Sequence, residues 1–276
     1  MDYFKEPTEK SGYLEQDFRL FHIKDQTRRD FSYHYHDFHK VIVFLSGKAA
    51  YHIEGKSYYL KSWDILLVNR HAIHKPEIDF SVPYERFVLW IRDDILQNEL
   101  TRCFQKASDR SFNLIRLDSH TQERLKQLLY ELEAALKDDT FGSKLLGDAL
   151  FTQFMVYINR IFLEKQYIFD RHSYTFDSQV EELLHYINQN LTEDLSIETL
   201  AKKYYLSKYH MMRKFKDETG YTIHNYIVNK RLLLARTKIR EGMPVLKAAQ
   251  LSGFTDYTTF SRAYKKQFGT APSQQG

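Results

Sequence analysis

The sequence contains a single cysteine, Cys103, together with five prolines and ten glycines in 276 residues. One cysteine forms neither an internal disulfide nor a thiolate zinc site, which excludes disulfide-rich secreted scaffolds and indicates a reducing compartment. The low proline and glycine content excludes collagen-like and low-complexity chains. No apolar run approaches the ~20 residues that span a bilayer, and the first residues lack the apolar core of a signal peptide. We therefore expect a cytoplasmic protein with no membrane partner.

The composition is that of a folded globular protein, with 43% hydrophobic and 28% charged residues. At about 150 residues per domain, the length predicts two domains. The net charge of +4 conceals an asymmetry along the chain. Residues 1–176 carry 25 Lys/Arg against 26 Asp/Glu, whereas residues 202–276 carry 15 against 4, a net charge of +11. A short, strongly basic segment favours a polyanionic partner such as nucleic acid.

Two hydrophobic periods divide the first half of the chain. Between Phe31 and Ile91 short apolar runs alternate with a period near two, which predicts antiparallel strands at 41–47, 50–60, 64–68 and 86–91 and a small barrel. From residue 120 the apolar positions have helical spacing, which predicts a helical hairpin at 118–166. The hairpin has more apolar surface than one barrel covers, so we expect a homodimer formed through outward positions such as Leu129 and Leu136.

The basic part of the chain contains a repeat of two short helices joined by a tight turn. Helices are predicted at 180–190, 197–205, 208–219, 223–240, 245–251 and 257–268. The pattern R-x-[FY]-K-x3-G begins at Arg213 and again 49 residues later at Arg262. Each copy follows a small-residue helix and a turn whose last residue, Ser207 or Asp256, is a good helix N-cap. Each copy is therefore predicted to be a helix-turn-helix.

The second helix of each copy has an apolar side and a polar side. Met211 and Phe215 are predicted to face inward in the first copy, as are Phe260 and Tyr264 in the second. Arginine and hydroxyl groups can contact base edges, and lysine neutralises phosphate. An all-helical interaction module without DNA is the alternative, and the duplication and the charge favour DNA. The predicted DNA-binding residues are Lys208, Tyr209, Met212, Arg213, Lys216, Tyr257, Thr258, Ser261, Arg262 and Lys265.

Residues 197–239 and 245–272 resemble the DNA-binding domain of the AraC/XylS family of bacterial transcription regulators. The resemblance rests on a repeated LA…S…FK…G pattern, on a Y…RL…A segment at Tyr226, and on a final GF…D…FSR…K…FG…P. It implies base-facing roles for seven of the residues above, namely Tyr209, Met212, Arg213, Tyr257, Thr258, Ser261 and Arg262. It also implies that the N-terminal segment is a cupin-like effector barrel, in which Trp63-Asp64 occupies the usual Gly-Asp position.

Four histidines of the predicted barrel, His34, His36, His39 and His74, invite a comparison with metal sites, because neutral imidazoles bind zinc, iron or nickel. The resemblance to metal-binding cupins implies an H-x-H pair, a glutamate and a later histidine. Lys40 occupies the glutamate position, and its ammonium group opposes a divalent cation. We therefore expect no metal and no other cofactor, and a metal-dependent cupin enzyme is the alternative.

A small polar ligand in the barrel, of the sugar class, fits the histidines and aromatic residues better. Histidines that only stabilise the fold are the competing hypothesis. No nucleophile–base arrangement or phosphate-binding glycine motif occurs, which favours a non-enzyme. Cys103 is predicted to be a packed residue. The predicted ligand-binding residues are His34, His36, His39, His74, Arg86 and Trp90.

The sequence thus predicts an α+β multidomain protein that regulates transcription by binding specific DNA under the control of a small ligand. Its predicted parts are a cupin-like β-barrel at 15–117, a helical hairpin at 118–166, a linker at 167–177 and an all-α double helix-turn-helix at 178–276. The predicted partners are double-stranded DNA, a small effector and a second copy of the chain, with RNA polymerase as a further candidate.

Overall fold

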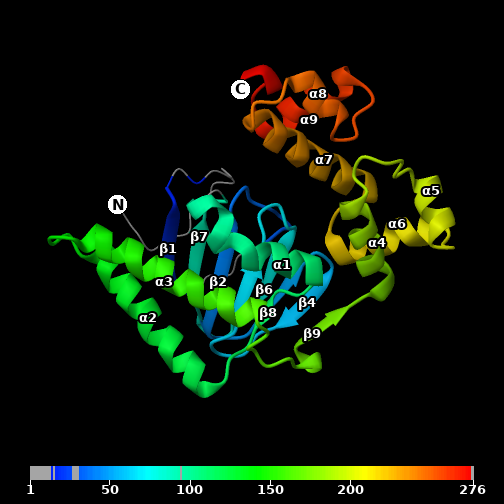
Figure 1. Cartoon of the computed structure of the whole chain (residues 1–276). Coiled ribbons are helices and arrows are strands. Elements are labelled where there is room, and N and C mark those ends of the chain that lie inside the picture. The colour runs from blue at the N-terminus through cyan, green and yellow to red at the C-terminus, as the bar shows by residue number, and fades with distance from the viewer. Residues whose placement is uncertain (1–13, 15, 27–30, 94, 275–276) are drawn as a thin grey trace. The chain divides into compact units, whose positions relative to one another are not determined.

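The computed structural model describes residues 14, 16–26, 31–93 and 95–274. The chain forms two compact units, of which the first ends at Thr175 and the second begins at Phe176 (Figure 1). The first unit contains two sheets with strand orders β1-β7-β2-β5-β8 and β6-β3-β4-β9. The strands of the first sheet are β1 (Phe18–Asp25), β2 (His39–Ser46), β5 (Ile65–Val68), β7 (Tyr84–Ile91) and β8 (Leu114–Ile115). Those of the second sheet are β3 (Ala49–Ile53), β4 (Lys56–Tyr59), β6 (His74–Ile78) and β9 (Tyr174–Phe176).

Successive residues of a strand point to opposite faces of the sheet, so each strand of the first sheet contributes side chains to both faces. The two faces have different neighbours. One face meets the second sheet, where the hydroxyl oxygens of Tyr84 and Tyr51 lie 3.3 Å apart. The other face is covered by helices (Figure 1). The Phe18 ring on β1 stacks there on Phe151, with ring centroids 3.8 Å apart. The helical elements of this unit are η1 (Ile95–Thr101), α1 (Arg102–Arg110), α2 (Ser119–Lys137), α3 (Ser143–Leu163) and η2 (Arg171–Ser173).

The predicted fold class is confirmed, since a sheet-rich N-terminal unit precedes an all-helical C-terminal one. The run predicted as one strand at 50–60 is a hairpin of β3 and β4. Its turn, Glu54-Gly55, has φ angles of 46° and 77°, which suit the twist of antiparallel strands. Strand β1 and helix α1 were not predicted, because the adjacent apolar residues Leu20 and Phe21 interrupt the alternation in β1 and α1 has few apolar positions. Cys103 is fully buried in α1, and burial raises the pKa of its thiol to about 12.

One residue of the hairpin prediction was wrong. Leu129 was expected to face outward, yet it is buried in the core that the hairpin shares with the sheet. Leu136, seven residues later, is 40% exposed as predicted. Leu129 lies in the middle of α2 and Leu136 one residue before its last, and helical spacing alone does not reveal where along the helix the core ends.

Trp63 adopts a backbone conformation that favours glycine. Its φ angle is 68°, in the left-handed region, where a non-glycine residue costs about 1–2 kcal/mol. The turn is retained because the Trp63 amide donates to the Phe44 carbonyl oxygen at 2.6 Å and the indole packs against the hydrophobic core. The turn places Asp64, 1% exposed, inside the unit.

Asp64 belongs to a buried ionic network that reaches the segment predicted as a linker. Arg116 donates from Nε to Asp64 Oδ1 at 2.8 Å and from Nη2 to Asp64 Oδ2 at 2.5 Å. Its Nη1 donates to Asp170 Oδ2 at 2.8 Å and also contacts Ser173 Oγ. Hydrogen bonds from Ser173 and from the His172 amide lower the pKa of Asp170 to about 2. The segment around Asp170 is therefore held on the first unit.

The second unit consists of helices arranged around a long central one. Its elements are α4 (Ser178–Gln189), α5 (Ile197–Lys203), α6 (Lys208–Thr219), α7 (Ile223–Arg240), α8 (Val245–Gln250), α9 (Tyr257–Phe268) and η3 (Pro272–Gln274). The predicted caps are confirmed: Ser207 Oγ accepts from the His210 amide at 3.2 Å, and Asp256 Oδ1 accepts from the Thr259 amide at 2.7 Å. No helix in the described part of the chain has the length and hydropathy needed to span a bilayer.

Candidate nucleic-acid interface and ligand site

Helix α6 separates its apolar and polar residues as the sequence predicted. Met211 and Phe215 are 1% and 0% exposed, and the Phe215 ring packs edge-on against Tyr226 of α7. The polar face is open to solvent: Tyr209 is 73% exposed, and Lys208, Met212, Arg213 and Lys216 are also exposed. Arg213 Nε lies 3.7 Å from Asp217 Oδ2 one turn away, a pair exposed enough to break at little cost.

Helix α9 repeats this arrangement. Phe260 and Tyr264 are buried in a cluster with residues of α7 and α8, including Leu232 and Ala249. The opposite face presents Tyr257, Thr258, Arg262 and Lys265 to solvent, with Ser261 half-buried. Both helices therefore turn a basic, hydroxyl- and aromatic-bearing surface outward.

Helix α7 connects the two copies and determines their spacing. It has 18 residues, so its length is about 27 Å. Helix α6 packs near its beginning, and α8 and α9 pack on its second half (Figure 1). Successive major grooves on one face of DNA lie about 34 Å apart. The length of the central helix is thus of the same order as the distance between neighbouring grooves.

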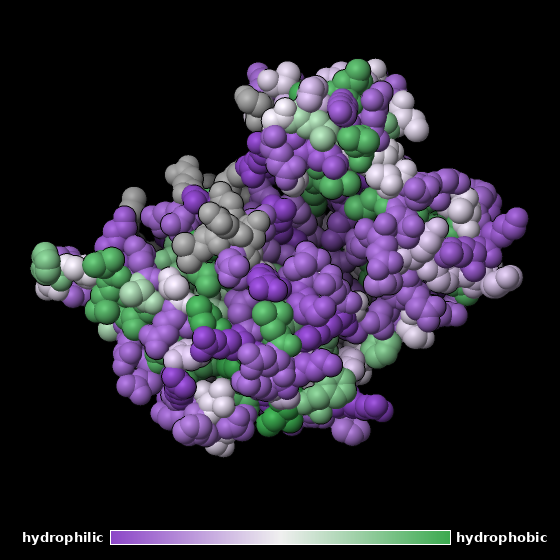
Figure 2. Space-filling model, in the orientation of Figure 1, coloured by the Kyte–Doolittle hydropathy of each residue, from purple (hydrophilic) through white to green (hydrophobic). Residues whose placement is uncertain are grey.

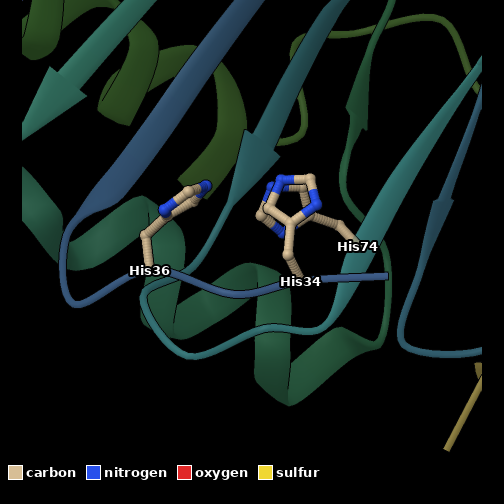
Figure 3. A group of neighbouring side chains, drawn as sticks. All are labelled: His34, His36 and His74. Carbon is tan, nitrogen blue, oxygen red and sulfur yellow. The ribbon is translucent and has the colours of Figure 1, made fainter. Parts of the chain in front are cut away.

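In the first unit, three histidines converge from two chain segments (Figure 3). His34 and His74 form a backbone bridge, with the His34 amide donating to the His74 carbonyl at 3.0 Å and the reverse bond at 2.9 Å. His36 follows on the same segment as His34. One imidazole nitrogen from each of the three residues lies within 4.8 Å of the others.

The protonation of these imidazoles follows from their surroundings. The Nδ1 atoms of His34 and His74 lie 2.8 Å from the Ser32 carbonyl oxygen and 2.9 Å from that of Ala72. A carbonyl only accepts, so the Nδ1 atom of each ring carries a proton, and in the neutral form of the ring Nε2 carries the lone pair. Burial lowers the pKa of His36 and of His74 far below the usual value, and the Lys40 ammonium group lowers both further. Both rings are therefore neutral at physiological pH.

The cluster of His34, His36, His74 and Trp90, called the pocket below, contains polar atoms that the described residues leave unsatisfied. His36 Nε2, His74 Nε2 and Trp90 Nε1 are buried and have no hydrogen-bond partner among those residues. The Trp90 ring lies 6.3 Å from the His36 ring, and Lys40 Nζ lies 5.6 Å from the Trp90 ring centroid. An unsatisfied buried polar atom costs about 1–3 kcal/mol, so three in one cluster make it the candidate ligand site.

Comparison with known proteins adds two matches to family models. The model of the AraC-like ligand binding domain matches residues 20–155, and that of a helix-turn-helix domain matches residues 200–275. The chain belongs to the AraC/XylS family. As a family member it is a DNA-binding transcription regulator with a ligand-binding domain, and the prediction of this family is confirmed.

Similar proteins span nearly the whole chain. The probable transcriptional regulator LumQ of Photobacterium leiognathi is 25% identical over 252 residues, which cover 88% of this chain and 91% of LumQ. The HTH-type transcriptional activator RhaS of Enterobacter sp. (strain 638) is 24% identical over 248 residues, covering 88% and 87%. The crystal structure of ToxT from Vibrio cholerae covers 94% of this chain and 96% of its own, with 16% identity and a TM-score of 0.35.

Two predicted ligand residues lie apart from the pocket of this AraC/XylS protein. His39 points to the helix-covered face of the sheet, where Nε2 bonds Asp93 Oδ1 at 2.8 Å and the ring stacks on Phe104. His39 directly precedes Lys40 on β2, and successive residues of a strand point to opposite faces of the sheet, so His39 points away from the face that carries Lys40. Arg86 is on the same face as Trp90 but four residues along β7, where it donates to Asp25 Oδ2 at 3.2 Å.

The sequence analysis did not identify some residues that contribute to these sites. The carbonyls of Ser32 and Ala72 orient the histidines, and a backbone group carries no signal in the sequence. Tyr205, 95% exposed in the turn before α6 with a φ angle of 53°, was not assigned to the DNA-binding surface. Its position in the turn of a predicted helix-turn-helix was the available signal.

Proposed function

We propose that this regulator binds a small polyhydroxylated ligand, of the sugar class, at His34, His36, His74 and Trp90, and that the ligand changes its affinity for DNA. The observation that carries the proposal is the group of buried, unsatisfied nitrogens in the pocket. Lone pairs on imidazole nitrogens accept from hydroxyl groups, and the Trp90 N–H and the Lys40 ammonium donate to hydroxyl oxygens. A polyol offers both kinds of partner, and the indole face adds an apolar surface for a sugar ring.

The proposed DNA contacts are the outward residues of α6 and α9, with α7 as the spacer. On this proposal residues 15–117 form the effector barrel, 118–166 the dimerisation hairpin, 167–177 the connection and 178–276 the DNA-binding domain. Contact with RNA polymerase would follow from a regulator bound next to a promoter. Ligand controls DNA binding only if it binds two states of the protein unequally, and such couplings are typically about 1–3 kcal/mol.

Screening saccharides by thermal shift tests the ligand class. At about 100 times its Kd, a ligand stabilises the folded protein by about 2.7 kcal/mol, which corresponds to a rise in Tm of about 5 °C or more. We expect His36→Ala to remove most of this rise, because His36 Nε2 is one of the unsatisfied atoms. We also expect the ligand to change operator affinity by about 5- to 150-fold in a DNA titration.

His52→Ala is the matched control for this experiment. His52 lies on β3 but bonds Ser57 Oγ at 2.7 Å and Glu77 Oε2 at 2.8 Å, outside the pocket. Its variant should keep the full ligand response. If a saccharide stabilises His36→Ala as much as wild type, or leaves operator affinity unchanged, the histidines have only a structural role and the proposal fails.

Dimerisation through the hairpin is a second expected property. The end of the hairpin exposes a group of large apolar side chains, seen as hydrophobic surface in Figure 2: Leu136, Phe141, Leu145 and Leu146 are 40%, 107%, 76% and 53% exposed. Such a patch on a soluble protein marks an interaction surface. We expect a dimer in analytical ultracentrifugation, and at least a tenfold increase in its dissociation constant in Leu145→Glu/Leu146→Glu.

Leu246→Glu on α8 is the control, since Leu246 is 55% exposed but lies in the other unit. It introduces the same charge away from the hairpin and should leave the dimer intact. A protein that sediments as a monomer at high micromolar concentration, with and without DNA, would rule out this role of the hairpin.

A further inference from the structure

The three imidazoles of the pocket bring one nitrogen each close together, and a single hydroxyl group does not account for all three. Nitrogens from His34, His36 and His74 all lie within 4.8 Å of one another (Figure 3). A single hydroxyl group donates one proton and satisfies one of these nitrogens. Imidazole nitrogens this close to one another are arranged as ligands of one metal ion are.

We infer that His34, His36 and His74 form a binding site for a divalent first-row transition metal, such as Zn²⁺, with at least one coordination position left for an exogenous oxygen ligand. Imidazole nitrogen suits zinc, nickel, iron and copper, and three protein ligands with an open fourth position are typical of zinc sites that bind a further molecule. The inference concerns the pocket of the proposed function, but it does not require the effector to be a sugar.

The surroundings of the histidines agree with this assignment. Ligating histidines generally donate their second N–H to a carbonyl or carboxylate, which fixes the ring and its tautomer. His34 does so to the Ser32 carbonyl, and His74 does so to the Ala72 carbonyl. The paired backbone bonds between residues 34 and 74 hold the two segments together.

Lys40 is the group that opposes the ion. Its side chain is 4% exposed, and its ammonium group has the largest charge effect on both His36 and His74. The ammonium lies 5.9 Å from the Phe38 ring centroid and 5.6 Å from that of Trp90, so cation–π interactions with these rings stabilise its charge. Removing this charge with Lys40→Met should therefore strengthen metal binding, by about tenfold or more.

The test is a titration of tag-free, full-length protein with Co²⁺ and Zn²⁺ after treatment with a chelator. We expect one ion per chain, a visible Co²⁺ absorption spectrum that reports nitrogen coordination, and displacement of Co²⁺ by Zn²⁺. His34→Ala and His36→Ala should each weaken binding by more than about 100-fold, because even the loss of an outer-shell partner costs 10- to 100-fold. His34 and His36 are only partly buried, so these variants are preferred to His74→Ala, whose residue is 2% exposed.

His52→Ala, on the outer side of the second sheet, is the control and should bind the ion like wild type. The assignment is overturned by less than one ion per chain, by equal affinity in the His36→Ala protein, or by unchanged affinity in Lys40→Met. Repeating the saccharide titration on metal-free protein separates the metal hypothesis from the sugar hypothesis. If the protein responds to a sugar but binds no metal, only the metal hypothesis fails. If it binds metal but does not respond to any sugar, only the sugar hypothesis fails.

Discussion

Simultaneous replacement of Arg213 and Arg262 with alanine is expected to weaken binding to specific DNA by about 2–6 kcal/mol, since each base-reading arginine contributes roughly 1–3 kcal/mol. Both side chains are exposed at matching positions of α6 and α9. Each single variant should relax the base preference at one position, and the two positions should lie about one helical turn of DNA apart. Competition binding against a randomised operator library at fixed salt measures both affinity and base preference.

Arg240→Ala is the matched control for this pair. Arg240 is exposed at the end of α7, so the variant removes the same charge outside the two recognition helices. We expect a smaller loss that is uniform over all sequences, as for a general electrostatic effect. If the Arg213 and Arg262 variants also lose affinity uniformly, without any change in base preference, the two arginines contact phosphate and not bases.

Breaking the Arg116 network is expected to cost the first unit about 3–5 kcal/mol in the free energy of unfolding, because Arg116→Met leaves the Asp64 carboxylate buried without its charged partner. The hydrogen bond with Asp64 also raises the pKa of the Arg116 guanidinium, as expected for a stabilised charge. Urea denaturation measures the loss. Limited proteolysis should cleave the segment around Asp170 faster in the variant, because Nη1 of Arg116 holds that residue.

Two further variants keep this test informative. Arg92→Met breaks an exposed pair, in which Arg92 Nη2 lies 2.7 Å from Asp17 Oδ1, and should cost less than about 1 kcal/mol. Arg116→Lys keeps the positive charge but loses the planar fork that bonds both oxygens of Asp64. It should fold with an intermediate loss of stability. A loss in Arg116→Met no larger than that in Arg92→Met would show that the network does not stabilise the unit.

The DNA-binding half was readily predicted from the sequence, because its helices are specified by local signals. The bounds predicted for α6, α7 and α9 agree with the structure, since a capping residue begins each helix and a turn residue ends it: Ser207 and Gly220 for α6, and Asp256 and Gly269 for α9. The left-handed φ angles of the two glycines, 74° and 77°, explain why glycine stands there. The inward and outward residues follow from the 3.6-residue period.

The barrel half depended more on contacts between distant residues. Its strands were predicted where the apolar period is clear, but the burial of Leu129 and the face of His39 depend on which helix covers which side of the sheet. Trp63 shows the same dependence, because its strained turn is retained by packing and by the bond to Phe44.

The sequence by itself determined the fold class, the family, the duplicated helix-turn-helix and the residue types available for DNA contact, because all of these follow from local periodicity and motifs. Only the tertiary structure decided which histidines meet and how Arg116 joins Asp64 to Asp170. Residues 34 and 74, like residues 64, 116 and 170, become neighbours through long-range strand pairing and packing. Their contacts decide the lone-pair directions, the burial and the charges on which the proposals for the pocket rest.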